Sequence, residues 1–321
     1  MAYSAGGLIE ATDYNGFVST TSGANVNTVW STGSTDSGWG QSALATVAAA
    51  GSITATQWAS LVNTIASMGS QTNTTITARS APVAGNTIEI LAALNTDLTN
   101  ITANRQNAVA NGTQFTGWTG TNSKTAATGT GTWTITFVNT VTFASADAAR
   151  YFFNAGGRIK IDVSKTATGA TGDPEWNDLA NTLCGDIFIT GGTATQTIAA
   201  ANYTGTTKVG GTGTPNILLT TTGWYDLTAG AAATIVYKQF ADTAPYTSNF
   251  IQHAIAKGAS SDTLIITTTW SNPEGDAISG GTASSGATPG TAPTTIVTYF
   301  PPSTTYLTAS WGTPTVAATT T

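Results

Sequence analysis

Charged residues are scarce in this chain. Asp, Glu, Lys and Arg make up 8% of its 321 residues, whereas about 25% is usual for a soluble domain. Ten residues are Lys or Arg, the net charge is −6, and the basic residues form no cluster. Nucleic-acid binding needs clustered cations that neutralise phosphates, so we expect no nucleic-acid partner. A neutral surface of hydroxyls and amides is instead typical of extracellular and particle-forming β proteins.

Cysteine and histidine each occur once, as Cys184 and His253. A single Cys excludes an intrachain disulfide, and one Cys with one His cannot form a typical zinc site. His253 would be the base of any Ser–His–acid triad, but the chain has no Gly-x-Ser-x-Gly motif to supply the nucleophile. His253 shares its strand parity with Ile251 and Ile255, which predicts a partly buried residue with a structural role. We expect no metal and no cofactor.

Long hydrophobic runs are also missing. The first residues, "MAYSAGGLIEATDYNG", have neither a basic nor an apolar region, so we expect no secretory signal. The longest apolar stretches, such as "ALATVAAAG", are too short to span a bilayer, so we expect no membrane insertion. An extracellular-like composition without a signal or a disulfide indicates a protein made in a cytoplasm and released by lysis, as phage particles are.

Residues 1–112 are predicted to form a helical attachment or assembly domain. In "ITATQWASLVNTIASMG", Thr54 and Gln57 form a capping-box pattern, an apolar stripe begins at Trp58, and Gly69 suits the position after the helix end. A weaker helix is expected over Thr12 to Trp30.

A second strong helix is expected from Asn86 to Ala110. Four apolar residues follow an a/d pattern along it: Leu91, Leu94, Leu98 and Ile101. This seam either packs on the preceding helix within one subunit or forms a short oligomeric coiled coil, for which a trimer is possible.

Residues 113–321 are predicted to form an antiparallel β-sandwich, jelly-roll-like, with one or two short helices. The chain is therefore expected to be of the α+β class. A long Gly/Ser/Thr-rich loop is expected around 278–294, and the last residues are expected to be mobile unless a neighbour holds them. The strand candidates are "TWTITFVNTVTF" (a single strand or a tight pair around Asn139), "RIKIDV", "DIFIT", "TQTIAAANY", "NILLTT", "TIVYKQF", "FIQHAIA", "TLIITTTW" and "TTIVTYF".

The acidic residues gather in "GDPEWND", at the start of a helix expected from Asp173 to Gly185. Two carboxylates serve glycosidase chemistry and three can bind calcium. However, acidic residues in the first turn also stabilise a helix through its dipole, and Asp173 is expected to be the N-cap. We therefore prefer the structural role for Asp173, Glu175 and Asp178.

The stretch "SADAARYFFNAGGRIKID" contains a helix capped by Ser145, followed by a turn and a strand. Phe152 and Phe153 are predicted to plug this helix onto the sheets. Phosphate-binding loops precede a helix, whereas Gly156 and Gly157 follow one. These glycines therefore predict a structural turn. Arg158 and Lys160 alternate with apolar residues, which places them on the solvated face of the strand.

Three sets of short motifs sample most of the chain. The first is "ATDYN" (11–15), "GWGQ" (38–41) and "ITATQW" (53–58), the second is "VTFASADAARYFFNAGGRIKI", and the third is "GWYDLT" (223–228) with "APYTSNFIQHAIAKG" and "IITTTWSN". Their order and spacing resemble those of structural proteins encoded by large contractile-tailed phages of marine cyanobacteria. The resemblance implies a virion component of the tail, baseplate or fibre region, with no catalytic residue to carry over.

Three functions follow as hypotheses. The first is a non-enzymatic virion protein that assembles with copies of itself and with other virion proteins. The second is an adhesin module that binds a receptor or host surface glycans, or a capsid decoration protein. The third, a hydrolase, requires a carboxylate pair or a triad in one cleft. The residues expected to carry structure or assembly are Trp58, Leu91, Leu94, Leu98, Ile101, Phe152, Phe153, Gly156 and Gly157.

Overall fold

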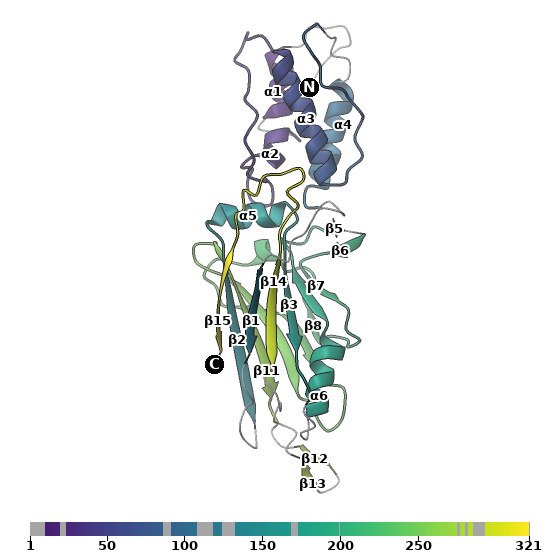
Figure 1. Cartoon of the computed structure of the whole chain (residues 1–321), viewed down its shortest axis with the longest axis vertical. Helices are drawn as coiled ribbons and strands as arrows, with labels where there is room; N and C mark the ends of the chain where they lie inside the picture. Colours follow the sequence, from purple (N-terminus) through teal and green to yellow (C-terminus); the bar gives the residue numbers. More distant parts are fainter. Residues whose placement is uncertain are drawn as a thin grey trace.

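The protein is elongated, with helices at one end and two antiparallel sheets at the other (Figure 1). We call the end of the sheets nearest the helices the upper end. The structure, a computed structural model, describes residues 10–19, 24–85, 91–107, 118–123, 132–167, 173–198, 200–274, 277–279, 282–284 and 293–320. The expected domain boundary at residue 112 lies outside these residues.

The helical end is formed by α1 (Ala11–Val18), α2 (Val26–Trp30), α3 (Ala55–Gln71) and α4 (Leu91–Ala103). The single helix expected over Thr12 to Trp30 is therefore wrong. It is divided into α1 and α2, because Asn25 caps a new helix by accepting a hydrogen bond from the Thr28 amide (3.0 Å).

The predicted start of α3 is confirmed, but its predicted end is wrong. Thr54 and Gln57 form the capping box, with 3.2 Å between the Gln57 amide and Thr54 Oγ1. The helix runs past Gly69 to Gln71. Gly69 serves packing instead, because an added Cβ would lie 3.0 Å from the Ile76 side chain.

The a/d seam of α4 is used within the chain. Leu94, Leu98 and Ile101 are buried in the same core as Trp58 of α3. The side chain of Leu91, and residues 86–90 and 108–110 of the expected helix, lie outside the described part. A seam already covered by the subunit's own helices is not available for a coiled coil, so the packing alternative is correct.

The first sheet contains, in spatial order, β1 (Trp118–Ser123), β14 (Thr294–Phe300), β3 (Arg158–Ser164), β4 (Asp186–Ile189) and β7 (Thr206–Val209). The second contains β15 (Thr315–Thr320), β2 (Trp133–Thr142), β11 (Thr263–Asn272), β10 (Phe250–Lys257), β9 (Thr234–Phe240) and β8 (Ile217–Leu218). Two small hairpins pair β5 (Gln196–Ile198) with β6 (Ala201–Tyr203) and β12 (Ala277–Ser279) with β13 (Thr282–Ser284).

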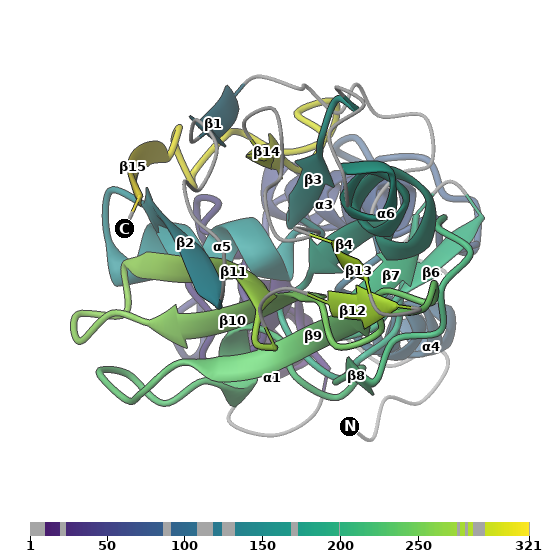
Figure 2. The ribbon, with the colours of Figure 1, turned by 90° about the horizontal axis from the view of Figure 1, so that it is seen from below.

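The two sheets face each other across a shared core (Figure 2). Ile161 and Val297 enter this core from the first sheet, and Ile255 and Ile266 enter it from the second. Early strands pair with late ones, β1 with β14 and β2 with β11, whereas the middle strands mostly pair with their neighbours in sequence. The chain therefore combines helices with antiparallel sheets, as predicted.

Strand β2 illustrates how the sequence specifies this arrangement. Ile135, Phe137 and Val141 are buried, whereas the residues between them, apart from Asn139, are Thr or Val and lie on the outer face. The segment is one continuous strand paired with β11 and β15, so the alternative of a tight pair around Asn139 is wrong.

The helix predicted from Asp173 to Gly185 is confirmed as α6 (Asp173–Asp178), which continues as a π-helix from Leu179 to Cys184. It ends at Gly185, whose φ of 72° suits glycine. Asp173 is the first residue of this helix, so its predicted role as the N-cap is wrong. Trp176 inserts between Trp133 and Trp270, at ring distances of 4.9 and 5.8 Å. The helical segment thus fills the lower part of the space between the sheets.

Arg158 does not lie on a solvated face, so that prediction is wrong. Lys160 is half-buried, with 3.3 Å between its Nζ and the carboxylate of Asp186. Arg158 is only 3% exposed, and its guanidinium lies 4.5 Å from the ring centroid of Tyr203 in β6. Burial lowers the pKa of Arg158 to about 10. The β5–β6 hairpin therefore covers this end of the face.

Short strands and connections account for the other differences. "TQTIAAANY" forms the β5–β6 hairpin instead of one strand, and "NILLTT" contributes only the two residues of β8. Part of the loop expected at 278–294 is the β12–β13 hairpin. The final residues form β15, which β2 holds in place. Strand β7 was not predicted.

Helix α5 (Ala146–Asn154) closes the upper end of the sheets. Ser145 caps it by accepting a hydrogen bond from the Ala148 amide (3.0 Å). Phe152 and Phe153 are fully buried, and their rings stack 5.1 Å from Tyr299 and 5.3 Å from Trp224. The predicted plug is confirmed.

The glycines that follow α5 are needed for this plug. Gly156 has a φ of 97°, which lets the chain turn directly from the helix into β3. At Gly157, an added Cβ would lie 2.5 Å from the Phe152 ring. Both residues are therefore explained by the turn and the packing.

We expect Phe152→Ala to lower the free energy of unfolding by about 3–5 kcal/mol, because it leaves a cavity in a close-packed aromatic cluster. Chemical denaturation measures this loss. Tyr306→Ala is the control: Tyr306 is 38% exposed, so its loss should stay within about 0.5 kcal/mol. A loss below about 1 kcal/mol for Phe152→Ala would contradict the plug.

Candidate functional site at the joint between helices and sheets

The helical end is joined to the sheets by a dense set of polar contacts, which we call the joint. It consists of the loop 31–41, helix α5, Tyr225, Arg105 and the loop 303–311. The first loop is tightly folded: Gly33, Gly38 and Gly40 have φ values of 54°, 99° and 67°. An added Cβ on Gly38 would overlap the carbonyl oxygen of Thr32, so this loop requires glycine.

Trp39 fixes the loop to both parts of the molecule. Its side chain is fully buried, and its indole nitrogen donates hydrogen bonds to the carbonyl oxygens of Asn154 (3.1 Å) and Arg105 (3.3 Å). Its own amide donates to Val29 in α2 (2.9 Å). One residue thus connects α2, α5 and the end of the helical region.

Gln41 connects the same loop to the chain beyond β14. Its Oε1 accepts hydrogen bonds from the Thr308 amide (2.9 Å) and hydroxyl (2.7 Å), and its Nε2 donates to the Thr308 carbonyl (3.0 Å). Ser310 adds a hydrogen bond from its hydroxyl to the Trp39 carbonyl (2.6 Å). The amide of Gln41 therefore makes backbone-like pairing between segments that are far apart in sequence.

Arg150 on α5 binds two carbonyl oxygens of the loop. Its Nη1 donates to Thr32 and to Ser37, each at 2.8 Å, while Nη2 donates to Asp147 (2.9 Å). Asp147 holds the guanidinium so that its other edge points at the loop. The planar fork of an arginine is suited to several simultaneous acceptors.

Asn154 is the most buried polar residue of the joint. It has no exposed surface, its Nδ2 donates to the Gly38 carbonyl (3.0 Å), and its Oδ1 accepts from the Tyr225 hydroxyl (2.6 Å). The Tyr225 hydroxyl also lies 3.3 Å from the Arg150 carbonyl. Burial raises the pKa of Tyr225, so it stays a neutral donor.

The joint brings together motifs that are far apart in the sequence. "GWGQ" supplies Gly38, Trp39 and Gln41, the second motif set supplies α5, and "GWYDLT" supplies Tyr225. All three motif sets thus contribute to one site. The site contains neutral amides, hydroxyls and carbonyls and two arginines that are paired within it, Arg150 with Asp147 and Arg105 with Asp36. This arrangement fixes two bodies together.

The residues predicted to carry structure fall into two groups. Trp58, Leu94, Leu98 and Ile101 form the core of the helical end, whereas Phe152, Phe153, Gly156 and Gly157 support the joint from the side of the sheets. Sequence reasoning missed Gln41, Arg150, Asn154 and Tyr225. The spacing of the glycines around Trp39 in "GWGQ" was the available signal, since it indicates a tightly turned loop.

The candidate chemical groups do not form a catalytic set. His253 is fully buried, with 2.9 Å between its Nδ1 and Thr268 Oγ1, and its ring stacks on Tyr237. Burial lowers the pKa of His253 to about 3 and raises that of Cys184 to about 12. His253 is therefore a neutral core residue, more deeply buried than predicted.

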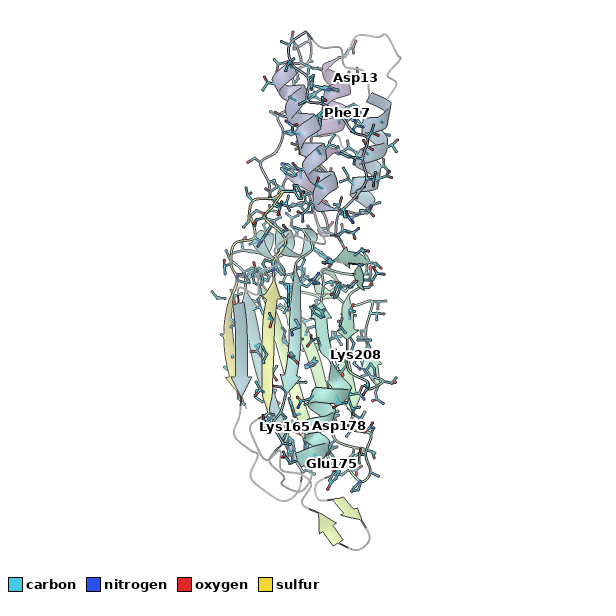
Figure 3. All side chains as sticks on the ribbon, turned by 45° about the vertical axis from the view of Figure 1, so that its right-hand side comes forward. Asp13, Phe17, Lys165, Glu175, Asp178 and Lys208 are labelled. Atoms are coloured by element: carbon cyan, nitrogen blue, oxygen red, sulfur yellow. The ribbon has the colours of Figure 1, made fainter. Side chains whose placement is uncertain are left out.

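The acidic residues Asp173, Glu175 and Asp178 do not share one environment. Asp173 is fully buried and forms an ion pair with Lys165, whose pKa burial lowers to about 8. Figure 3 shows Lys165, Glu175 and Asp178 around α6 at the lower end of the sheets. Within the described residues, no three His, Cys, Asp or Glu side chains lie close enough together to hold a metal ion.

A hollow of about 500 Å³ lies on the helical end, between α3 and residues 73–79. Its lining is mostly small and uncharged, and Arg79 at its edge is paired with Asp97. The hollow therefore presents no acid–base pair to a substrate.

Comparisons of the chain with protein-family models, with curated proteins and with solved structures give no match. Among the helices of the described residues, none is long and apolar enough to cross a bilayer.

The hydrogen bond between Asn154 and Tyr225 can be tested with a double-mutant cycle. Tyr225→Phe and Asn154→Ala should each lower the free energy of unfolding by about 1–3 kcal/mol, because each leaves a buried polar group without its partner. The double variant should lose less than the sum, with a coupling of about 0.5–3 kcal/mol. Tyr306→Phe is the control for loss of an exposed hydroxyl, and strictly additive losses would contradict the proposed pairing.

His253 should make stability depend on pH. Its pKa is lowered to about 3 in the folded state, against about 6.5 in the unfolded chain. Between these values the unfolded state binds more protons, so stability falls as pH falls from about 6.5 towards 3, by up to about 1.4 kcal/mol per pH unit.

Equilibrium unfolding of the wild type and of His253→Gln, measured from pH 7 to pH 4, isolates this effect from the carboxylates. The wild type should lose more stability than the variant over this range. Parallel pH profiles for the two proteins would show that His253 does not titrate on unfolding.

Proposed function

We propose that this chain is a non-enzymatic structural protein of a phage virion, assembling as a homo-oligomer in the tail, baseplate or fibre apparatus. The observation that carries the proposal is the convergence of the three motif sets on the joint. Motifs separated by more than 100 residues, such as those containing Trp39 and Asn154, contribute to one connection. The resemblance to virion proteins therefore concerns the site that holds the two ends of the molecule in a fixed relation.

The chemistry of the joint supports a mechanical role. Trp39 and Asn154 are fully buried and hydrogen-bonded to backbone groups. Breaking such contacts leaves buried donors and acceptors unpaired, which costs about 1–3 kcal/mol for each group. The helical end and the sheets should therefore move as one rigid unit, as a component that transmits position or force within a particle must.

We infer that the two sheets form a β-sandwich related to the jelly roll. The pairing of β1 with β14 and of β2 with β11 resembles the nested pairing of Greek-key sandwiches. The neighbour-to-neighbour pairing of β8 to β11 departs from that pattern. The helical end would then be the attachment or assembly part, and the sandwich would project from it.

An adhesin that binds a receptor or host glycans, or a capsid decoration protein, is the alternative. Exposed aromatic residues would favour binding to sugars. Among the described side chains, however, Tyr306 is the most exposed aromatic residue and the others are half-buried or buried. Six of the nine tryptophans are buried: Trp39, Trp58, Trp176, Trp224, Trp270 and Trp311. We therefore prefer the assembly role.

Purified particles test the proposal. We expect the chain to be present at a fixed, stoichiometric copy number in phage particles purified by density gradient, as measured by quantitative mass spectrometry. A virion map should show the helical end against a neighbouring protein. A chain that is present in the lysate but missing from purified particles would contradict the proposal. Binding on a glycan array without incorporation into particles would favour the adhesin.

A further inference from the structure

The outer face of the second sheet contains no charged residue on its three central strands. The outward-facing residues of β2, β11 and β10 are Thr, Val, Ile, Ala and Gln, with Ser271 and Phe250 at one end of the face. They form three rows across the sheet, which are Thr136–Thr269–Gln252, Val138–Thr267–Ala254 and Thr140–Ile265–Ala256. Ala254 and Ala256 are only 7% and 8% exposed.

The middle row continues on both sides. Thr319 of β15 lies opposite Val138, and Ile235 of β9, which is 37% exposed, lies opposite Ala254. Lys238 stands at one corner of the face, where its Nζ lies 3.7 Å from the ring centroid of Phe250. The described helices lie at the upper end of the sheets or between them, so none of them covers this face (Figures 1 and 2).

The first sheet is different. Its outer face carries Lys160, Asp162 and Asp186, with Lys160 Nζ 3.3 Å from Asp186 and 3.8 Å from Asp162. The β5–β6 hairpin covers Arg158 on the same face, with Tyr203 against the guanidinium. Charge and cover thus distinguish the two faces, and none of the described helices covers the neutral one.

We propose that the outer face of the second sheet packs against the same face of a second copy of this chain. Interface cores are depleted in charged residues, and a neutral face can meet its own copy without like-charge repulsion. A two-fold axis along β11 would place Thr267 against Thr267 of the other copy. Lys238 of each copy would then face the β2 side of its partner, away from the other Lys238.

The size of the face is sufficient for such a pair. Four strands at about 4.8 Å and eight residues at about 3.3 Å give about 19 by 26 Å. Two copies would cover about 1,000 Å² in total, at the lower limit for a specific interface. A contact of this size fits copies that a particle already holds side by side, because their effective concentration is high.

This inference deepens the proposed function by naming the surface through which copies associate, and its test uses the purified full-length chain. Sedimentation velocity over a concentration series should show a monomer–dimer equilibrium for the wild type. Thr267→Glu should weaken the dimer at least tenfold, because like charges would meet at the axis, and Thr267→Lys should do the same.

A mixture of the Thr267→Glu and Thr267→Lys proteins should restore the dimer, which shows that both variants remain folded. The matched control is Thr294→Glu, at a half-buried position on the outer face of the first sheet, and it should leave the dimer unchanged. A monomeric wild type, or a dimer that Thr267→Glu does not weaken, would overturn the inference. A dimer in solution combined with absence from particles would leave this inference standing while the proposed function fails.

Discussion

The burial of Phe152 and Phe153 between the two sheets is the contact on which the rest of the structure depends. These rings pack against Tyr299 of the first sheet and against Trp224 in a short 3-10 helix between β8 and β9, so α5 cannot shift without opening the core. Trp39 and the carbonyl groups of the loop 31–41 form hydrogen bonds with this helix α5. Because α5 is fixed by the plug, these bonds also fix the helical end. A hydrogen bond specifies a position only when both partners are held, and the aromatic plug holds one of them.

Low charge determines how the two ends are connected. Desolvating an ion pair costs several kcal/mol per ion, whereas amides and hydroxyls that find partners are buried at much smaller cost. The joint therefore relies on Gln41, Asn154 and backbone carbonyls, and each of its two arginines is paired with an aspartate, Arg150 with Asp147 and Arg105 with Asp36. Carbonyl acceptors in turn require a loop whose backbone is turned inwards. The positive φ of Gly38 and Gly40 provides that backbone.

The sequence predicted elements with strong local signals and failed where partners are distant. The capping box at Thr54, the Ser145 cap of α5 and the alternation in β2 depend on neighbours within a few residues, and all three predictions are confirmed. Arg158 was predicted to be solvated because the alternation of residues indicates which face of the sheet a side chain lies on, but not whether another segment covers that face. The covering residue, Tyr203, belongs to a hairpin about 45 residues later. Periodicity likewise could not decide whether the seam of Leu94 and Leu98 meets its own chain or another. The joint was invisible for the same reason, since Trp39 and Asn154 are 115 residues apart.

Threonine links the fold to the surface that it presents. β-branched residues favour strands, so a chain with few charges fills the outer positions of its strands with Thr, Val and Ile, as β2 and β11 do. A hydroxyl stays hydrated in a single subunit, and it also finds a partner when two sheets meet, as Thr134 and Ser271 already do across neighbouring strands at 3.1 Å. The free-energy cost of a face of this composition is therefore small both when it is exposed to water and when it is buried between two sheets. Burying a charged face costs more, because its ions must be paired or remain in water.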